Sequence, residues 1–312
     1  MEGKAILELE EVATNVKGPV LVTGASTGIG RCIAETLAGN GYLVYATARK
    51  KSDIQSLAAI KNIEPMKLDV TKQADVDRAV EEVRRRGKGL FGLVNVAGIG
   101  DIWPLCELED EGLRRVFEVN VFGVHRVTRA MLPFLAEARG RIINISSIGG
   151  LIAYGMRGGY SMSKWSIESY SECLNQELER HGIRVSVVEP AYFRTKANEA
   201  ATKLAMDRAR SAKPVIMKTE IQDLVRDLPR ISENWQKRNT PEKVAAAVLA
   251  LLRSEKPRSR CLVSTTKEQF LEPIDALIGR AVDINVDDEF SLSQAEMHSV
   301  LDRMWDKTRT HT

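Results

Sequence analysis

The chain has 312 residues, which is enough for one large domain or two ordinary ones, and we favour one domain with an extension. Hydrophobic residues make up 44% of the chain and charged residues 28%, as in an ordinary soluble globular protein. The 45 lysines and arginines nearly balance the 42 aspartates and glutamates, so a net charge of +3 argues against a nucleic-acid-binding protein.

Cysteine and histidine spacing argues against a metal site and against a disulfide framework. The four cysteines and four histidines are scattered without a Cys-x-x-Cys pair or metal-ligand spacing (Cys32, Cys106, Cys173, Cys261; His125, His181, His298, His311). Residues 1–18 form a leader that does not read as a secretory signal, and no run approaches the roughly 18 apolar residues of a membrane helix. We therefore expect a cytoplasmic protein without a metal or a transmembrane segment.

The first apolar run, Pro19–Val22, stops at a glycine-rich turn, and helix-forming residues follow to Leu37. Strand, glycine turn and helix in this order are the context in which Gly-x-x-x-Gly-x-Gly predicts dinucleotide binding. Glycines let the backbone approach a pyrophosphate, which then faces the unpaired amides of the helix N-terminus. The turn residues predicted to bind the cofactor are Gly24, Ser26, Thr27, Gly28, Ile29 and Gly30.

The next expected strand, Tyr42–Thr47, leads into Arg49, and no acidic residue follows before Asp53. In dinucleotide-binding folds, an acid near this strand end binds the ribose hydroxyls of NAD, whereas an arginine accommodates the extra phosphate of NADP. The sequence therefore favours NADP(H) over NAD(H). The alternative is that Arg49 and Lys50 only begin a solvated loop.

Further strands are expected at residues 64–68 and 90–94, separated by a helix over 73–86. Alternating strands and helices predict an α/β, Rossmann-type, doubly wound parallel sheet with helices on both faces. Ligands bind such sheets beyond the carboxyl ends of the strands. The turns that collect there add Asp69, Val70, Asn95, Ala97 and Gly98 to the predicted cofactor site.

Two polar positions in the middle of the chain suggest chemistry. Asn120 interrupts the apolar side of a helix expected over 108–135. A buried asparagine needs hydrogen-bond partners for its amide, and the simplest interpretation is that it satisfies a distortion of this helix. The strand 141–145 ends beside Ser147, and a helix that runs to about His181 carries Tyr160 and Lys164 one turn apart. A cation beside a phenol favours release of its proton, which would make Tyr160 a general acid or base.

The last third of the chain carries a sixth strand, 183–188, then a segment at 192–240 that is either a substrate lid or a rigid helical insertion. A helix over 241–252 and a strand over 260–263 bring the expected sheet to about seven strands. We therefore assign 19–265 to one domain. Residues 266–312 form a C-terminal helical extension, predicted as two amphipathic helices joined by the acidic residues 287–289.

These motifs together resemble the short-chain dehydrogenase/reductase family from about Pro19 to Val263. The family's Asn-Asn-Ala-Gly corresponds to residues 95–98, with Val96 at its second position, and its Pro-Gly corresponds to Pro190-Ala191. Its catalytic residues correspond to Asn120, Ser147, Tyr160 and Lys164. Shorter motifs at residues 45–49 and 147–151 look most like the hydroxysteroid and retinol dehydrogenases.

The resemblance implies an NADP(H)-dependent oxidoreductase for a fairly apolar secondary alcohol or ketone. It also implies cofactor contacts from Tyr160, Lys164, Pro190 and Thr195, a water held by Asn120, and a homodimer or homotetramer. Two alternatives remain open: a 3-oxoacyl-thioester reductase, and a non-catalytic protein that senses NADP(H).

Overall fold

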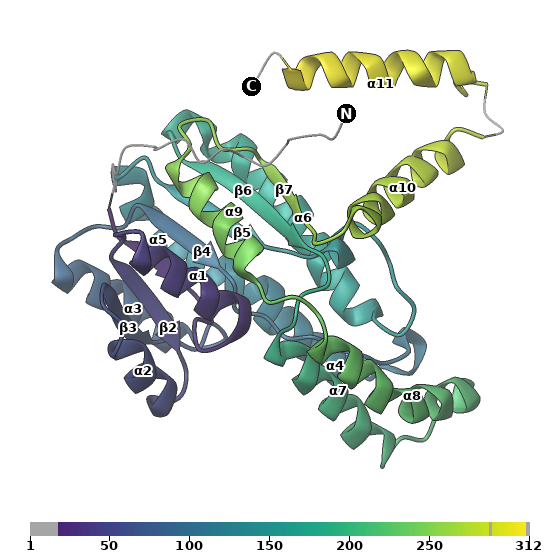
Figure 1. Cartoon of the computed structure of the whole chain (residues 1–312), viewed down its shortest axis with the longest axis horizontal. Helices are drawn as coiled ribbons and strands as arrows, with labels where there is room; N and C mark the ends of the chain where they lie inside the picture. The colour runs from purple at the N-terminus through teal and green to yellow at the C-terminus, as the bar shows by residue number, and fades with distance from the viewer. Residues whose placement is uncertain (1–17, 287–288, 310–312) are drawn as a thin grey trace. The chain divides into compact units, whose positions relative to one another are not determined.

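The computed structural model describes residues 18–286 and 289–309, and its centre is a sheet of seven parallel strands in the order β3-β2-β1-β4-β5-β6-β7 (Figure 1). This confirms the predicted fold class. The leader (1–17) and most of the acidic linker (287–288) lie outside the described residues. The strands are β1 Val20–Val22, β2 Val44–Ala48, β3 Ile63–Lys67, β4 Gly92–Asn95, β5 Arg141–Ile145, β6 Arg184–Pro190 and β7 Arg260–Val263.

The five central strands are buried on both faces because alternate side chains enter two different hydrophobic cores, whereas the edge strands β3 and β7 are only partly buried. In β1, Val20 and Val22 pack into one core with residues of α1 and α9, whereas Leu21 packs into the other core with residues of α3 and α5. Figure 1 shows α1 and α9 over one face of the sheet. The helices of this layered part are α1 Gly28–Gly39, α2 Lys51–Ala58, α3 Gln73–Arg86, α5 Gly123–Glu137, α6 Gly158–Leu178 and α9 Glu242–Arg253.

The long helix expected over 108–135 is built differently from the prediction. It consists of α4 (Asp110–Phe117), a π-helical turn (Glu118–Phe122) and α5. The wider turn contains Asn120, which is the distortion that an asparagine in an apolar helix suggested.

The segment 192–240 folds as two helices, α7 (Lys196–Ala209) and α8 (Lys218–Gln236). They share a small hydrophobic core in which Ala205, Leu224 and Leu228 pack with Trp103. The segment is therefore helical with buried contacts of its own, which both a lid and a rigid insertion allow.

The chain divides into two compact units, one through Phe270 and one from Leu271. The two helices expected near the C-terminus are α10 (Lys267–Ile284) and α11 (Gln294–Arg309). Among the helices described, none is both long enough and apolar enough to cross a membrane.

The glycine turn gives a test of the fold at Gly30. A Cβ at this position would lie 2.3 Å from the carbonyl oxygen of Gly24, whereas a Cβ at Gly39 on the same helix would meet nothing within 4 Å. We expect Gly30→Ala to lower the free energy of unfolding by about 1–3 kcal/mol. Urea titration of both variants measures this difference, and Gly39→Ala should be neutral or slightly stabilising. Equal stabilities of the two variants would contradict the close backbone packing.

Candidate active site

A cavity of about 690 Å³ opens at the carboxyl edge of the sheet, where the turns after β1, β4, β5 and β6 meet. Of the predicted site residues, all but two line it. Those that line the cavity are Gly24, Ser26, Thr27, Gly28, Ile29, Gly30, Arg49, Asp69, Val70, Ala97, Gly98, Ser147, Tyr160, Lys164, Pro190 and Thr195.

The turns after β1 and β4 are fastened to each other. Thr23 Oγ1 accepts hydrogen bonds from the backbone amides of Val96 (2.9 Å) and Ala97 (3.1 Å). Gly24 has a φ of 65°, and a Cβ there would lie 2.8 Å from Ala97 Cα. Thr23 is the first residue of the family's glycine motif, but sequence reasoning assigned it no role, although a hydroxyl at a strand end can hydrogen-bond to a neighbouring turn.

The turn fits a dinucleotide. No side chain caps the N-terminus of α1, since its N-cap residue, Thr27, makes no side-chain capping hydrogen bond. The first amides of the helix therefore have no side-chain partner from the cap and can bind a phosphate. Gly28 has a φ of 58°, and a Cβ there would lie 3.6 Å from Thr195 Cβ.

Arg49 and Asp69 line the cavity at the ends of β2 and β3. Asp69 accepts hydrogen bonds from the hydroxyl (2.7 Å) and the amide (3.1 Å) of Thr71. Burial opposes ionisation of Asp69, but these hydrogen bonds and the charge of Arg49 together hold its pKa below the ordinary value. Asp69 is thus an ionised turn residue, and the exposed Arg49 is the cation at this end of the cavity.

Ser147, Tyr160 and Lys164 meet in one place. A Cβ on Gly149 would lie 3.2 Å from Tyr160 Cε1 and 3.6 Å from Ser147 Oγ, so the phenol ring and the hydroxyl flank the same glycine. The buried Lys164 Nζ lies 5.8 Å from the centroid of the Tyr160 ring and donates a hydrogen bond to the carbonyl of Ile145 at 2.9 Å. The predicted convergence of these three side chains is therefore present.

Asn120 is near this group but does not line the cavity. Its amide donates to the carbonyl of Ile99 (2.9 Å) and to Ser163 Oγ (3.0 Å), and its oxygen accepts from the amide of Ile99 (2.8 Å). The side chain thus fixes the π-helical turn against the loop after β4.

Asn95 is a correction to the predicted cofactor site. It is buried, does not line the cavity, and donates hydrogen bonds to Thr128 (3.0 Å) and Asn144 (2.9 Å). It joins β4 to β5 and α5 inside the protein, because its side chain leaves the strand toward one face of the sheet and not toward its end.

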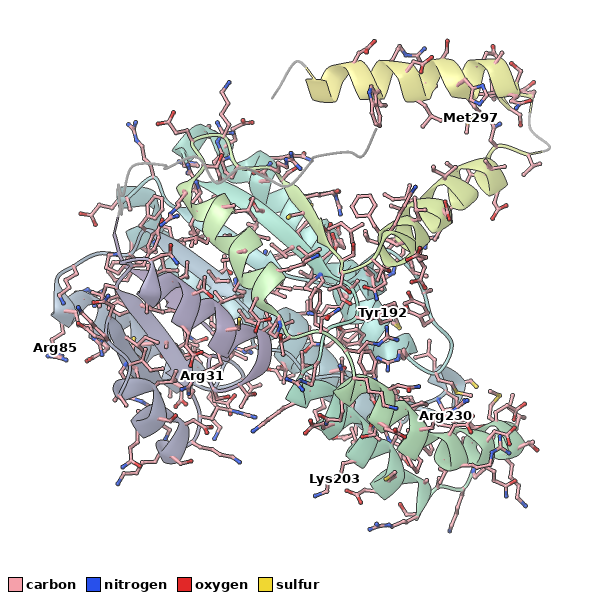
Figure 2. All side chains as sticks on the ribbon, viewed as in Figure 1. Arg31, Arg85, Tyr192, Lys203, Arg230 and Met297 are labelled. Carbon is pink, nitrogen blue, oxygen red and sulfur yellow. The ribbon has the colours of Figure 1, made fainter. Side chains whose placement is uncertain are left out.

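The wall opposite the glycine turn contains residues that sequence reasoning did not single out. The hydroxyl groups of Tyr154 and Tyr192 form a hydrogen bond with an oxygen–oxygen distance of 3.0 Å. The guanidinium of Arg157 stacks over Trp235 (5.3 Å), and that of Arg238 stacks over Tyr192 (4.9 Å). Figure 2 labels Tyr192. We call these five residues the aromatic-arginine wall. The only sequence signal for it was the mixture of aromatic and basic residues in 192–240.

In the part of the chain that the structure describes, no group of three or more His, Cys, Asp or Glu side chains could hold a metal ion.

The short chain dehydrogenase family profile matches residues 19–205. The chain belongs to the short-chain dehydrogenase family. This short-chain dehydrogenase is 39% identical over 181 residues to human 17-beta-hydroxysteroid dehydrogenase type 6. The aligned region covers 56% of this chain and 57% of that protein. It is 35% identical over 236 residues to rat mitochondrial D-beta-hydroxybutyrate dehydrogenase. The aligned region covers 72% of this chain and 66% of that protein.

The structure is similar to that of a short-chain dehydrogenase from Streptomyces avermitilis, with a TM-score of 0.68 and 30% sequence identity. That similarity covers 95% of this chain and 98% of the other. The hydroxysteroid dehydrogenase belongs to the branch that the strand-end motifs resemble.

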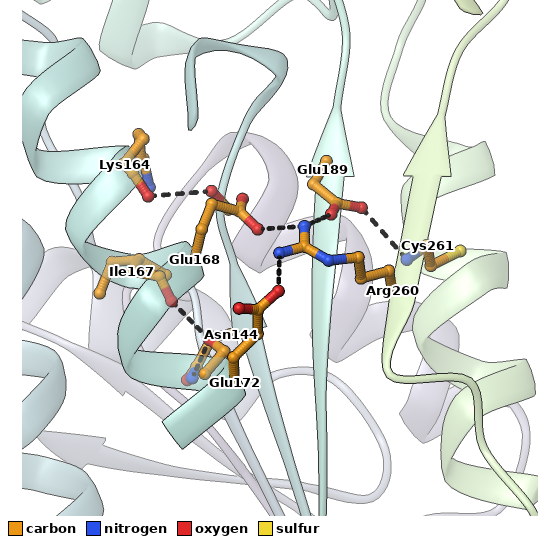
Figure 3. Close-up of polar contacts among 10 residues, drawn as sticks. Asn144, Lys164, Ile167, Glu168, Glu172, Glu189, Arg260 and Cys261 are labelled. Carbon is orange, nitrogen blue, oxygen red and sulfur yellow. Dashed lines mark hydrogen bonds and ion pairs between the residues drawn. The ribbon is translucent and has the colours of Figure 1, made fainter. Parts of the chain in front are cut away.

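Helix α6 of this short-chain dehydrogenase also takes part in a charge cluster, shown in Figure 3. Arg260 on β7 forms ion pairs with Glu168 (2.7 Å) and Glu189 (2.8 Å), which are both buried, and with the exposed Glu172 (2.5 Å). Glu168 lies one turn after Lys164. The cluster thus links the helix that carries Tyr160 to β6 and β7.

One arginine does not fully compensate two buried carboxylates. Burial raises the pKa of Glu189 from 4.5 to about 7, with a further contribution from the charge of Glu168, while Arg260 lowers it only in part. Burial likewise raises the pKa of Glu168. The folded protein therefore holds a proton in this cluster at a pH at which the unfolded chain has released it.

We expect this proton to make stability depend on pH. The folded state binds it more tightly, so the free energy of unfolding should fall as the pH rises from about 4.5 to about 7. The upper limit of the fall is about 3 kcal/mol, at about 1.4 kcal/mol per pKa unit. Glu189→Gln should remove most of this dependence in urea titrations between pH 5 and pH 8.

Glu172→Gln, at the exposed end of the same cluster, is the control and should keep the wild-type dependence. An unchanged pH dependence in Glu189→Gln would refute the shared proton.

Proposed function

We propose that this short-chain dehydrogenase uses NADP(H) to interconvert a secondary alcohol and a ketone on a fairly apolar substrate. The observation that carries the proposal is the meeting of Ser147, Tyr160 and Lys164 at the cavity that the glycine turn also lines. The cofactor, when bound, supplies or accepts the hydride. The protein's own residues then have to position the substrate and move one proton.

In the reducing direction, Tyr160 donates its proton to the substrate oxygen, and in the oxidising direction it accepts that proton. Ser147 donates a hydrogen bond to the same oxygen and stabilises the charge that develops there, a contribution of about 3 kcal/mol where the donor is preorganised. The Gly149 amide donates to Ser147 Oγ at 3.1 Å, which leaves the hydroxyl proton free for this purpose. The Lys164 ammonium stabilises the phenolate.

The choice of NADP(H) rests on the end of β2. Arg49 lines the cavity there. Residues 49–52, which follow β2, include no acid that could bind the ribose hydroxyls. The carboxylate of Asp69, just after β3, already accepts a hydrogen bond from the Thr71 hydroxyl.

The apolar substrate is supported by the lining of the cavity, which includes Ile99, Val119, Ile148, Phe193 and Ile231. The names of the two related proteins, a hydroxysteroid and a hydroxybutyrate dehydrogenase, agree with a secondary alcohol as substrate.

The two alternative functions predict different behaviour toward substrate and cofactor. A 3-oxoacyl-thioester reductase would turn over coenzyme-linked ketones faster than free ones. A protein that only senses NADP(H) would bind the cofactor without consuming it, and the presence of both Tyr160 and Lys164 in the cavity argues against it.

We also propose a cytoplasmic homodimer or homotetramer, by resemblance to the family. Large apolar side chains exposed next to α5 and on α6, Phe122 and Met162, support pairing through these helices. Sedimentation of the full chain tests the oligomeric state, and a monomer would refute it.

Tyr160→Phe is the test of the chemistry. Without the hydroxyl there is no proton donor, so turnover of NADPH with a panel of ketones should fall by about a hundred- to ten-thousandfold, while NADPH binding by fluorescence titration stays within about threefold. Tyr170→Phe is the matched control, because Tyr170 lies on the same helix and does not line the cavity. Near-normal turnover in Tyr160→Phe would reject the mechanism.

Arg49→Ala is the test of the cofactor. Loss of a charge-assisted contact to the extra phosphate should lower kcat/KM for NADPH by about ten- to a hundredfold and leave that for NADH nearly unchanged. Lys50→Ala, at a neighbouring exposed cation that does not line the cavity, is the control. If the ratio of NADPH to NADH efficiency stays constant in Arg49→Ala, the protein does not select NADP(H) through this residue.

A further inference from the structure

The charges that line the cavity are strongly unequal. Among the described residues that line it, one carboxylate faces five cations. The carboxylate is Asp69, and the cations are Arg49, Arg157, Lys164, Lys196 and Arg238. Arg49 and Lys164 already have parts in the proposed chemistry. Arg157 and Arg238, both in the aromatic-arginine wall, have none.

Arg157 is a half-buried cation without a carboxylate partner among the described residues. It immediately precedes α6 and stands three positions before Tyr160. Burial lowers the pKa of Arg157, and the groups that counter this are the phenols of Tyr160, Tyr192 and Tyr154. A guanidinium in such a place has donors to offer and no anion to receive them.

Arg238 differs from the two arginines on α8. Arg226 and Arg230 on α8 are both paired with aspartates, Arg226 with Asp223 at 2.7 Å and Arg230 with Asp227 at 3.7 Å. Arg238, just beyond the end of α8, has no carboxylate partner within the described residues and is held over the ring of Tyr192. Stacking orients the guanidinium while leaving its edge free for a planar anion.

The wall has a further unpaired donor. The indole nitrogen of Trp235 is buried and has no hydrogen-bond acceptor in the described part of the chain. Buried donors are normally paired, so an orphan beside two unpaired guanidinium groups indicates that an acceptor belongs in this region.

The proposed cofactor does not account for these donors. Its phosphates are assigned to the glycine turn before α1 and to Arg49 after β2, whereas Arg157 and Arg238 belong to the segments before α6 and after α8. Tyr160, where hydride and proton transfer meet, lies next to this second group.

We propose that the aromatic-arginine wall binds the carboxylate of the substrate, which is therefore a hydroxy acid or oxo acid with an apolar body. This deepens the proposed function and rests on it for the reaction. Arg157 and Arg238 hold the carboxylate, the apolar lining holds the chain or ring, and the carbonyl lies at Tyr160 and Ser147. Two cations from different segments would select an acid over its ester or amide.

Calorimetry with octanoate and octanamide tests this proposal, because the two probes match in length and differ in charge. In the presence of NADP+ at neutral pH, we expect the wild-type protein to bind octanoate at least about tenfold more tightly. Arg238→Met should lower this preference by about ten- to a hundredfold, and Arg238→Lys should retain part of it. Arg157→Met should have the same effect as Arg238→Met.

Arg230→Met is the matched control, because Arg230 lies on α8, is paired with Asp227 and does not line the cavity (labelled in Figure 2). It should keep the wild-type preference. Equal binding of the two probes by the wild type, an unchanged preference in Arg238→Met, or an equal loss in Arg230→Met would overturn the proposal. Calorimetry needs no turnover, so this result is independent of the outcome for Tyr160→Phe.

Discussion

The structure depends on one constraint: a sheet of seven parallel strands, five of them buried on both faces, leaves its polar turns at the two ends of the strands only. Since all strands run the same way, the turns that follow β1, β4, β5 and β6 collect at one edge. That edge is held tightly, because Thr23 ties the turn after β4 to the end of β1 and Gly24 lies against Ala97. Groups far apart in the sequence are thus brought to one cavity without a dedicated domain.

Helix α6, which carries Tyr160 and Lys164, is fixed at several points along its first turns. Gly149 touches both Tyr160 and Ser147, Lys164 donates to the end of β5, and Asn120 reaches Ser163 from the π-helical turn. One turn further on, Glu168 joins Arg260 on β7. Buried ionic contacts of this kind contribute little net stability, but they demand a specific geometry, and here that geometry aligns the helix with the sheet.

Much of this arrangement could be predicted from the sequence, because the governing patterns are local. The glycine turn, the helix over Gln73–Arg86 and the strand Arg141–Ile145 follow from spacing alone and are found where expected. Asn95 was misassigned because a position at a strand end does not say whether the side chain points along the strand or toward one face. Its partners, Thr128 and Asn144, are distant in sequence and left no local signal.

The aromatic-arginine wall could not be predicted for a related reason. Its members come from the loop before α6 and from the segment 192–240, and they acquire a common role only when α7 and α8 pack beside the sheet edge. The turns after β1 and β5 thus hold the glycine motif and Ser147, and α6 holds Tyr160. The aromatic-arginine wall comes from the loop before α6, from the residues just before α7 and from the end of α8. Substitutions at Tyr192, Trp235 and Arg238 can change the charge and shape of that wall while the glycine turn and Ser147 stay in place. In the proposed function, reaction chemistry and substrate selection are thus assigned to different residues of one cavity lining, and neither set can be inferred from the other.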